Sequence, residues 1–164
     1  MDAEECRTAS KLPIILMLDS IRSLNNVGSL LRTSDAFMIK EVIFCGITGI
    51  PPHPEIHKTA LGAEESVNWR YEESCMDELH KLKADGWKIC VLEQTHNSVM
   101  LQDFSPVKGE RYVLICGNEV HGVDQKIVDA ADIILEIPQC GAKHSLNVSV
   151  STGIALWTLF SHLK

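Results

Sequence analysis

The chain has 164 residues, of which 45% are hydrophobic, which suits one globular domain with a buried core better than two small ones. Its 15 Lys and Arg side chains and 22 Asp and Glu side chains give a formal net charge of −7. This acidic balance counts against a protein that binds nucleic acid over its whole surface. It still allows a local basic patch, because net charge does not describe the field at one cleft.

The six cysteines indicate a reduced, cytoplasmic protein. None belongs to a C-x-x-C pair, and Cys45, Cys90 and Cys116 lie in apolar, β-branched runs typical of buried strands. The apolar run Pro13–Leu18 is far too short for a membrane helix, and no secretory signal is visible. We therefore expect a cytoplasmic protein with free thiols and no membrane attachment.

The first third of the chain alternates between strand and helix patterns. Residues 1–12 are polar and are expected to form a tail, so the single domain is expected to span residues 13–164. The apolar run Ile14–Leu18 predicts a strand, and Asn26–Met38 predicts a helix because its apolar side chains recur at helical spacing. Val42–Cys45 predicts a second strand, and Gly and Pro residues after it predict turns.

The same alternation continues to the C-terminus. The predicted elements are a helix at Met76–Ala84, strands at Trp87–Leu92 and Tyr112–Cys116, a helix at Asp124–Ala130, a strand at Ile133–Ile137 and a final helix at Ser145–His162. This order predicts an α/β fold with a mainly parallel sheet flanked by helices. Active sites of such folds lie at the carboxyl ends of the strands, where three unusual loops are expected.

The first loop opens the predicted helix at Asn26. The side chain of Asn26 can cap that helix, Gly28 allows a close backbone approach, and Arg32 lies under two turns further on. Asn26 and Arg32 can then face one cleft, where a guanidinium suits a phosphate. An ordinary cap followed by a surface arginine would give the same pattern.

The second loop, Gly117–Gly122, directly follows a predicted strand. Its two glycines let the backbone pass close to a ligand, with Asn118 and Glu119 between them. Glu119 could hold a cationic partner or cap the helix that starts near Asp124. A plain strand-to-helix turn also favours Gly and Asn, so this loop alone decides nothing.

The third loop runs from Ile137 to the start of the last helix. Ser145 is the expected N-cap of that helix. Asn147 would then lie in the first turn, where Asn is a poor helix former and has no evident structural role. We therefore interpret Asn147 as a functional residue.

Together, the three loops resemble the signature motifs of the SpoU (TrmH-like) family of SPOUT RNA methyltransferases. The motifs are N-x-G-x-x-x-R, then G-N-E-x-x-G after a strand, then I-P-x-x-G-x-x-x-S-L-N-V, in the family's order and spacing from Asn26 to Val150. Family members often have Gly where Met38 stands, and the position of His121 varies among them. Neither position is a catalytic one.

The resemblance implies transfer of a methyl group from S-adenosyl-L-methionine (AdoMet) to a ribose 2′-hydroxyl of tRNA or rRNA, with tRNA favoured. It also implies a homodimer, a C-terminal trefoil knot in which AdoMet binds bent, and no metal. The implied catalytic residues are Asn26, Arg32, Glu119, Ser145 and Asn147. The implied cofactor-binding residues are Leu92, Glu93, Gln94, Gly117, Asn118, Gly122, Ile137, Pro138, Ser145 and Leu146, and the implied RNA-binding residues are Arg32, Lys143 and His144.

Within this reading, Arg32 binds the phosphate beside the target ribose and stabilises developing oxyanion charge. It is a poor general base, because the pKa of a free arginine exceeds about 12. Asn26 and Glu119 are expected to orient Arg32 and the ribose, while Ser145 and Asn147 shape the cofactor loop and the site of the nucleophile.

Other functions fit less well. A dinucleotide-dependent oxidoreductase would show G-x-G-x-x-G after the first strand, and the segment after Leu18 lacks it. No histidine pair has zinc-ligand spacing with cysteine partners. A catalytically inactive RNA-binding module of the same fold stays open, although every motif residue is present. Methyl transfer to a base is disfavoured, because in the family that this chain resembles the S-L-N-V motif marks the enzymes that methylate the ribose 2′-hydroxyl.

Overall fold

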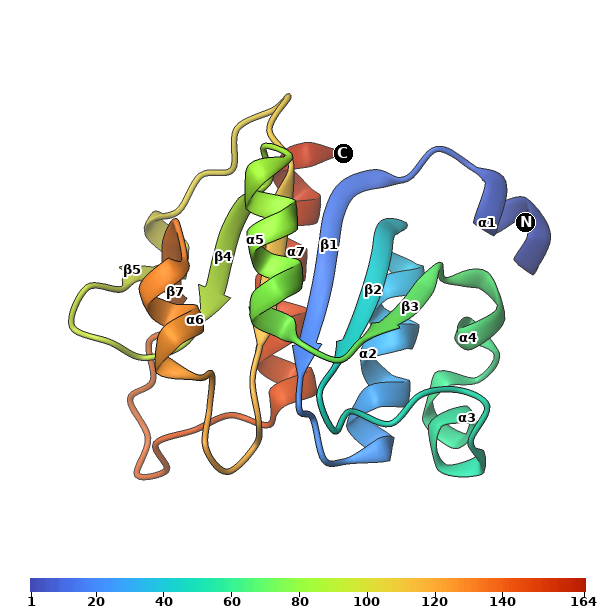
Figure 1. Ribbon diagram of the computed structural model, residues 1–164, viewed down its shortest axis with the longest axis horizontal. Coiled ribbons are helices and arrows are strands. Elements are labelled where there is room, and N and C mark those ends of the chain that lie inside the picture. Colours follow the sequence, from blue (N-terminus) through green and yellow to red (C-terminus); the bar gives the residue numbers. More distant parts are fainter.

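The computed structural model describes residues 1–164, which form one seven-stranded sheet in the order β3-β2-β1-β6-β4-β7-β5 (Figure 1). Every strand pair is parallel, so the expected α/β fold with a mainly parallel sheet is confirmed. The strands are β1 (Leu12–Asp19), β2 (Ile39–Cys45), β3 (Trp69–Glu72), β4 (Lys88–Leu92), β5 (Val99–Met100), β6 (Tyr112–Cys116) and β7 (Ile133–Glu136).

Helices cover both faces of the sheet, as a parallel sheet requires. In Figure 1, α5 and α6 lie in front of the sheet and α2 and α7 behind it. The helices are α1 (Ala3–Thr8), α2 (Leu24–Ala36), α3 (Pro54–Ala60), α4 (Ala63–Ser66), α5 (Cys75–Ala84), α6 (Gln125–Ala130) and α7 (Val148–Leu163), with a 3₁₀ turn at Leu101–Asp103. No helix combines the length and the hydropathy needed to span a lipid bilayer.

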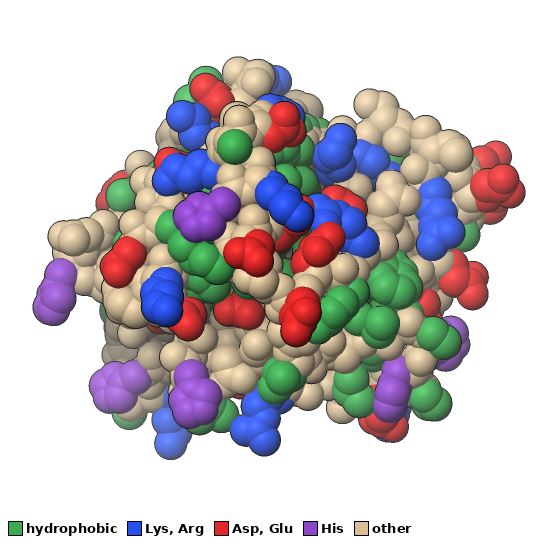
Figure 2. All heavy atoms as spheres, in the orientation of Figure 1, with side chains coloured by type: hydrophobic (Ala, Val, Ile, Leu, Met, Phe, Trp, Pro, Cys, Tyr) green, Lys and Arg blue, Asp and Glu red, His purple; other side chains and the backbone are tan.

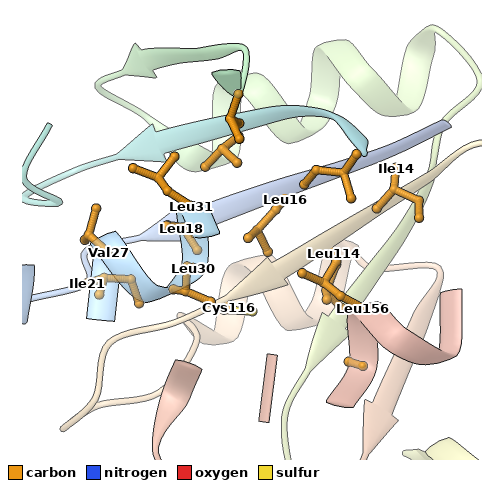
Figure 3. Close-up of a cluster of buried hydrophobic side chains, with 14 of the residues drawn as sticks. Ile14, Leu16, Leu18, Ile21, Val27, Leu30, Leu31, Leu114, Cys116 and Leu156 are labelled. Atoms are coloured by element: carbon orange, nitrogen blue, oxygen red, sulfur yellow. The ribbon is translucent and has the colours of Figure 1, made fainter. Parts of the chain in front are cut away.

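The side chains of β1 alternate between two cores. Ile14, Leu16 and Leu18 point into the core shared with α2 and α7, part of which Figure 3 shows. Ile15 and Met17 point to the opposite face, into the core covered by α5 and α6. All five are at most 1% exposed, and burying each such side chain stabilises the fold by about 1.5–3 kcal/mol. This two-sided burial fixes the central strands, and with them the loops at their carboxyl ends.

The N-terminal residues differ from the expected tail because they include α1. The Asp2 side chain accepts from the Glu5 N–H at 2.8 Å, and the Glu5 side chain accepts from the Asp2 N–H at 2.9 Å, which closes a capping box. Cys6 is buried, with its Sγ 3.5 Å from the Sδ of Met38. The polar composition of these residues did not predict a helix, because α1 buries only one side chain, that of Cys6.

Four further elements had no apolar run to reveal them. Strands β3 and β5 are edge strands of four and two residues, and helices α3 and α4 have seven and four residues. The last helix begins at Val148, so the prediction that Ser145 is its N-cap is wrong.

Candidate active site

The three unusual loops meet at the carboxyl edge of the sheet, at the bottom of Figure 1. This follows from the parallel topology, since the loops after β1, β6 and β7 all leave the sheet at the same edge. The loops after β6 and β7 line a cavity of about 590 Å³, the larger pocket. Its lining includes Gly117, Asn118, Glu119, Gly122, Ser145, Leu146 and Asn147.

A series of hydrogen bonds joins one residue from each loop. The Asn147 Nδ2 donates to the Asn26 Oδ1 at 3.3 Å. The Asn26 Nδ2 donates in turn to the Glu119 Oε1, also at 3.3 Å. The structure therefore brings three of the five predicted catalytic residues into direct contact. In the sequence, Glu119 lies 93 positions and Asn147 lies 121 positions after Asn26.

Glu119 also closes the start of α2. Its carboxylate accepts from the backbone N–H groups of Arg22, at 2.9 Å, and Ser23, at 3.0 Å. Burial raises the pKa of Glu119, but the hydrogen bonds from Arg22, Ser23 and Asn26 outweigh it and hold that pKa below its ordinary value. The sequence suggested that Glu119 holds a cationic partner or caps the helix near Asp124. In the structure it does neither, because its carboxylate binds the residues before α2. Asp124 caps α6 itself, through the N–H of Lys126.

The helix caps are distributed differently from the sequence expectation. Ser23, not Asn26, is the N-cap of α2, and its hydroxyl accepts from the Asn26 N–H at 3.2 Å. Asn147 is the N-cap of α7, and its Oδ1 accepts from the Ser149 N–H at 2.8 Å. The Asn147 amide thus has both a structural and a site role, because its oxygen caps α7 while its nitrogen reaches Asn26.

Close backbone approach explains the two glycines of the second loop. A Cβ at Gly117 would collide with the backbone of Gly122 and Val123, and Gly122 has φ +70. A Cβ at Gly122 would overlap the carboxylate of Glu93. That carboxylate accepts from the N–H of Gln94 at 2.9 Å and of Val123 at 3.0 Å, so it ties the loop after β4 to the loop after β6.

A smaller pocket adjoins the larger one and shares with it Leu92, Glu93, Ser145, Leu146 and Ser151. Apolar side chains form part of its wall, and Gln94, Ile137, Gln139 and His144 complete it with Leu135. Residues 138–146 make no hydrogen bond within the chain, so their backbone groups are free to bind a ligand. Of the ten predicted cofactor-binding residues, all except Pro138 line one of these pockets.

Comparison with known proteins agrees with this geometry. The chain matches the model of the SpoU rRNA Methylase family over residues 13–157, which is most of its length. The chain belongs to the SpoU family.

Three proteins with known names or structures are similar to this chain. The 23S rRNA (guanosine-2′-O-)-methyltransferase RlmB of Pseudomonas putida is 31% identical over 147 residues, which are 88% of this chain and 57% of RlmB. The AdoMet-bound rRNA methyltransferase of Sinorhizobium meliloti has a TM-score of 0.86 and 26% identity, over 97% of this chain and 60% of that one. The A. aeolicus TrmH/SpoU tRNA modifying enzyme has a TM-score of 0.85 and 26% identity, over 98% of this chain and 80% of that one. The chain therefore spans about three-fifths of the length of the first two relatives.

Arg32, the arginine of the first SpoU motif, does not join the hydrogen-bonded series. It is exposed on α2 and lines a separate hollow with Asp35, Met38 and residues of α1 and α4. The expectation that Asn26 and Glu119 orient Arg32 is not met within one chain. Six residues turn an α-helix through about 600°, so Asn26 and Arg32 lie about 120° apart around α2.

The remaining SpoU site residues divide between the pockets and the surface. Ser145 lines both pockets, and its hydroxyl has no hydrogen-bond partner in the chain. Of the predicted RNA-binding pair, His144 lines the smaller pocket, whereas Lys143 is exposed and lines neither.

Several pocket residues were missed at the sequence level, among them Ser151 and Cys116. Ser151 lies four residues after Asn147, so helical spacing would have placed it on the same face of α7. Cys116, at the end of β6, lines the larger pocket, and its Sγ lies 3.0 Å from the Thr152 Oγ1. Burial raises the pKa of Cys116 to about 12, which keeps the thiol protonated and unsuited to act as a nucleophile.

Proposed function

We propose that this protein binds AdoMet and transfers its methyl group to a ribose 2′-hydroxyl of RNA. The observation that carries the proposal is the series Asn147–Asn26–Glu119, which joins all three SpoU motifs at the mouth of the larger pocket. The named activity of RlmB and the AdoMet bound to the S. meliloti relative support it.

The two pockets fit the chemical parts of AdoMet. Leu92, Ile137 and Leu146 offer apolar walls for a flat base, and the free backbone groups of residues 138–146 can bind its polar edge. Gly117 and Gly122 line the larger pocket, where the absence of a Cβ lets the loop after β6 fold closely on itself and against Glu93. When bound, AdoMet supplies the electrophilic methyl group.

The chain's own residues hold and orient the attacking ribose. Both ends of the Asn26 and Asn147 amides are engaged, so their orientation is fixed before RNA arrives. Ser145 lines both pockets, and we assign its hydroxyl to the 2′-hydroxyl of the ribose. Glu119, whose pKa is lowered, is a weak base and acts by position. Arg32 binds the phosphate beside the target ribose and stabilises developing negative charge.

A second copy of the chain would complete the site. The exposed face of α7 carries Val150, Ile154 and Trp157 at helical spacing, with 51%, 41% and 53% of each exposed. Helix α7 packs against α2, where the Trp157 ring lies 5.9 Å from the Phe37 ring. A homodimer formed through this face would bury the stripe and bring the exposed side of α2, with Arg32, close to the pocket of the other copy.

Three finer assignments belong to the same proposal. We favour tRNA over rRNA, with the A. aeolicus tRNA modifying enzyme as support. We infer that the C-terminal segment is threaded as a trefoil knot, as the resemblance to the SpoU family implies. We place the protein in the cytoplasm, since all six of its cysteines are free and five of them are buried.

The test is transfer of tritiated methyl groups from AdoMet to total RNA that lacks native modifications. Digestion should leave the label in an alkali-resistant dinucleotide, which reports ribose 2′-O-methylation and identifies the RNA. Label in an alkali-released mononucleotide would instead indicate base methylation. RNA binding without AdoMet binding would favour the inactive RNA-binding module and contradict the proposal.

A further inference from the structure

A further hollow, of about 500 Å³, lies at the opposite edge of the sheet from the catalytic loops. Its walls come from the amino ends of the strands, since Pro13 is the second residue of β1, Trp87 directly precedes β4 and Arg111 directly precedes β6. We call it the basic groove, and its lining is Arg7, Ala9, Lys11, Pro13, Lys40, Glu41, Asn68, Trp87 and Arg111.

The basic groove reverses the charge balance of the whole chain. Four of its nine lining residues are cationic, in a protein whose formal net charge is −7. Its one carboxylate, that of Glu41, already accepts from the Arg70 Nε at 2.9 Å. Figure 2 shows Lys and Arg side chains gathered over the upper part of the view, where the amino ends of the strands lie in Figure 1.

The four cations are available to an external anion. Arg7 and Lys40 are exposed and make no ion pair. The Lys11 Nζ lies 3.4 Å from the Cys6 Sγ and faces no carboxylate. Arg111 pairs with the Asp85 carboxylate at 3.5 Å and also donates to the Asp85 carbonyl oxygen, but the two side chains are 42% and 72% exposed, so solvent weakens the ion pair.

Arg111 also presents its guanidinium as a flat surface. Its Cζ lies 4.9 Å from the centroid of the Trp87 ring. This stacking holds the planar group in place, which lowers the entropy lost when it binds a phosphate. Long, separate cations around a hollow suit a chain of phosphates better than a single base edge.

We propose that the basic groove binds the sugar–phosphate backbone of the RNA substrate at a point remote from the methylated ribose. This inference rests on the proposed function and deepens it. The eight residues of β1 separate the two edges of the sheet by about 25 Å, at roughly 3.3 Å per residue. One RNA must therefore extend at least that far to reach both the groove and the catalytic pocket. Such a contact explains how an acidic chain binds a polyanion.

The experiment compares two double variants that lose the same charge. Arg7→Gln with Lys40→Gln removes two cations of the basic groove. Lys81→Gln with Lys126→Gln removes two exposed cations without ion pairs from α5 and α6, and serves as the control. The probe is a labelled, unmodified tRNA transcript, whose affinity for the full chain is measured between about 50 and 200 mM salt.

We expect the groove variant to bind tRNA more weakly and the slope of log K against log salt to flatten by about 2. The ratio of the wild-type affinity for tRNA to that of the groove variant should then fall about tenfold between about 50 and 200 mM salt. The KM for tRNA should rise with kcat unchanged, and AdoMet affinity by calorimetry should stay the same. The control variant should keep the wild-type slope.

An unchanged slope in the groove variant, or an equal change in the control, would overturn the proposal. Binding of polyglutamate as strong as that of tRNA, and lost in the same groove variant, would assign the groove to an acidic protein instead. The binding measurement needs no methyl transfer. A protein that fails to methylate RNA therefore still tests the groove separately from the proposed function.

Discussion

The Asn26 amide donates a hydrogen bond to the carboxylate of Glu119, 93 positions later in the chain. The same carboxylate accepts hydrogen bonds from the backbone N–H groups of Arg22 and Ser23, the two residues immediately before α2. One acidic side chain thus fixes both the entry to a helix and Asn26, the middle residue of the hydrogen-bonded series at the pocket. A change at Glu119 should therefore affect stability and activity together.

Replacing Glu119 with Gln removes the charge and keeps an acceptor oxygen. We expect the free energy of unfolding at neutral pH to fall by about 1 kcal/mol, as for a weakened helix cap. Although burial raises the pKa of Glu119, its hydrogen bonds hold the folded value below the ordinary 4.5. The wild-type advantage should be fully present above pH 4.5 and disappear as the pH falls through the folded pKa.

Urea titrations of both proteins over a range of pH measure this difference. Glu65→Gln is the control, because Glu65 is exposed and its side chain makes no hydrogen bond. A stability difference that grows as the pH falls would contradict the hydrogen-bonding role assigned to Glu119.

Asn147 allows the cap of α7 to be separated from the contact with Asn26. Asn147→Asp keeps an oxygen for the Ser149 N–H but loses the N–H that reaches Asn26. We expect stability close to the wild type and a fall in kcat of about tenfold to hundredfold, because misplaced site residues are costly. Asn147→Ala should in addition lower the free energy of unfolding by about 1 kcal/mol. Wild-type turnover in Asn147→Asp would show that the contact with Asn26 has no part in catalysis.

Alanine variants of Gly122 and Gly109 distinguish the effect of a strained backbone from the effect of a steric clash with a neighbouring side chain. Both have positive φ, +70 and +94, so alanine at either should cost about 1–2 kcal/mol of stability. A Cβ at Gly122 would also displace Glu93 from the pocket wall, whereas a Cβ at Gly109 meets no atom within 4 Å. We expect only Gly122→Ala to weaken AdoMet binding by calorimetry. Equal AdoMet affinities in the two variants would show that the position of Glu93 does not affect AdoMet binding.

Trp157 tests the proposed dimer. Trp157→Glu places a charge on the apolar stripe of α7, and burying it unpaired in an interface would cost several kcal/mol. We expect a monomer by analytical ultracentrifugation and loss of methyl transfer, with the fold retained. Val107→Glu is the control, because Val107 is 59% exposed and lies in the loop before β6. A Trp157→Glu protein that remains dimeric would locate the interface elsewhere.

Apolar runs were sufficient to predict the central elements. Tyr112–Cys116 is buried at all five positions and forms a strand with the predicted bounds. Elements without such runs were missed, among them the edge strand β3, whose residues are Trp, Arg, Tyr and Glu. Edge strands and short helices bury little apolar surface, so their formation depends on neighbours that a local pattern does not contain.

The side-chain partners within the site depended on the tertiary structure. Local spacing suggested that Asn26 and Arg32 share a cleft, whereas helix geometry turns them to different sides of α2. The capping residues were displaced by a few positions in the same way, to Ser23 and Asn147.

By itself, the sequence determined the α/β class, the three loops and the residue types available for chemistry, because hydrophobic periodicity and motif spacing are local properties. The tertiary structure alone decided that Glu119 binds the backbone of the two residues before α2, far away in sequence, and that Asn147 reaches Asn26. Parallel strands deliver distant loops to one edge of the sheet. Which side chains then meet there is set by the packing of α2 and α7 on its face, which no local pattern records.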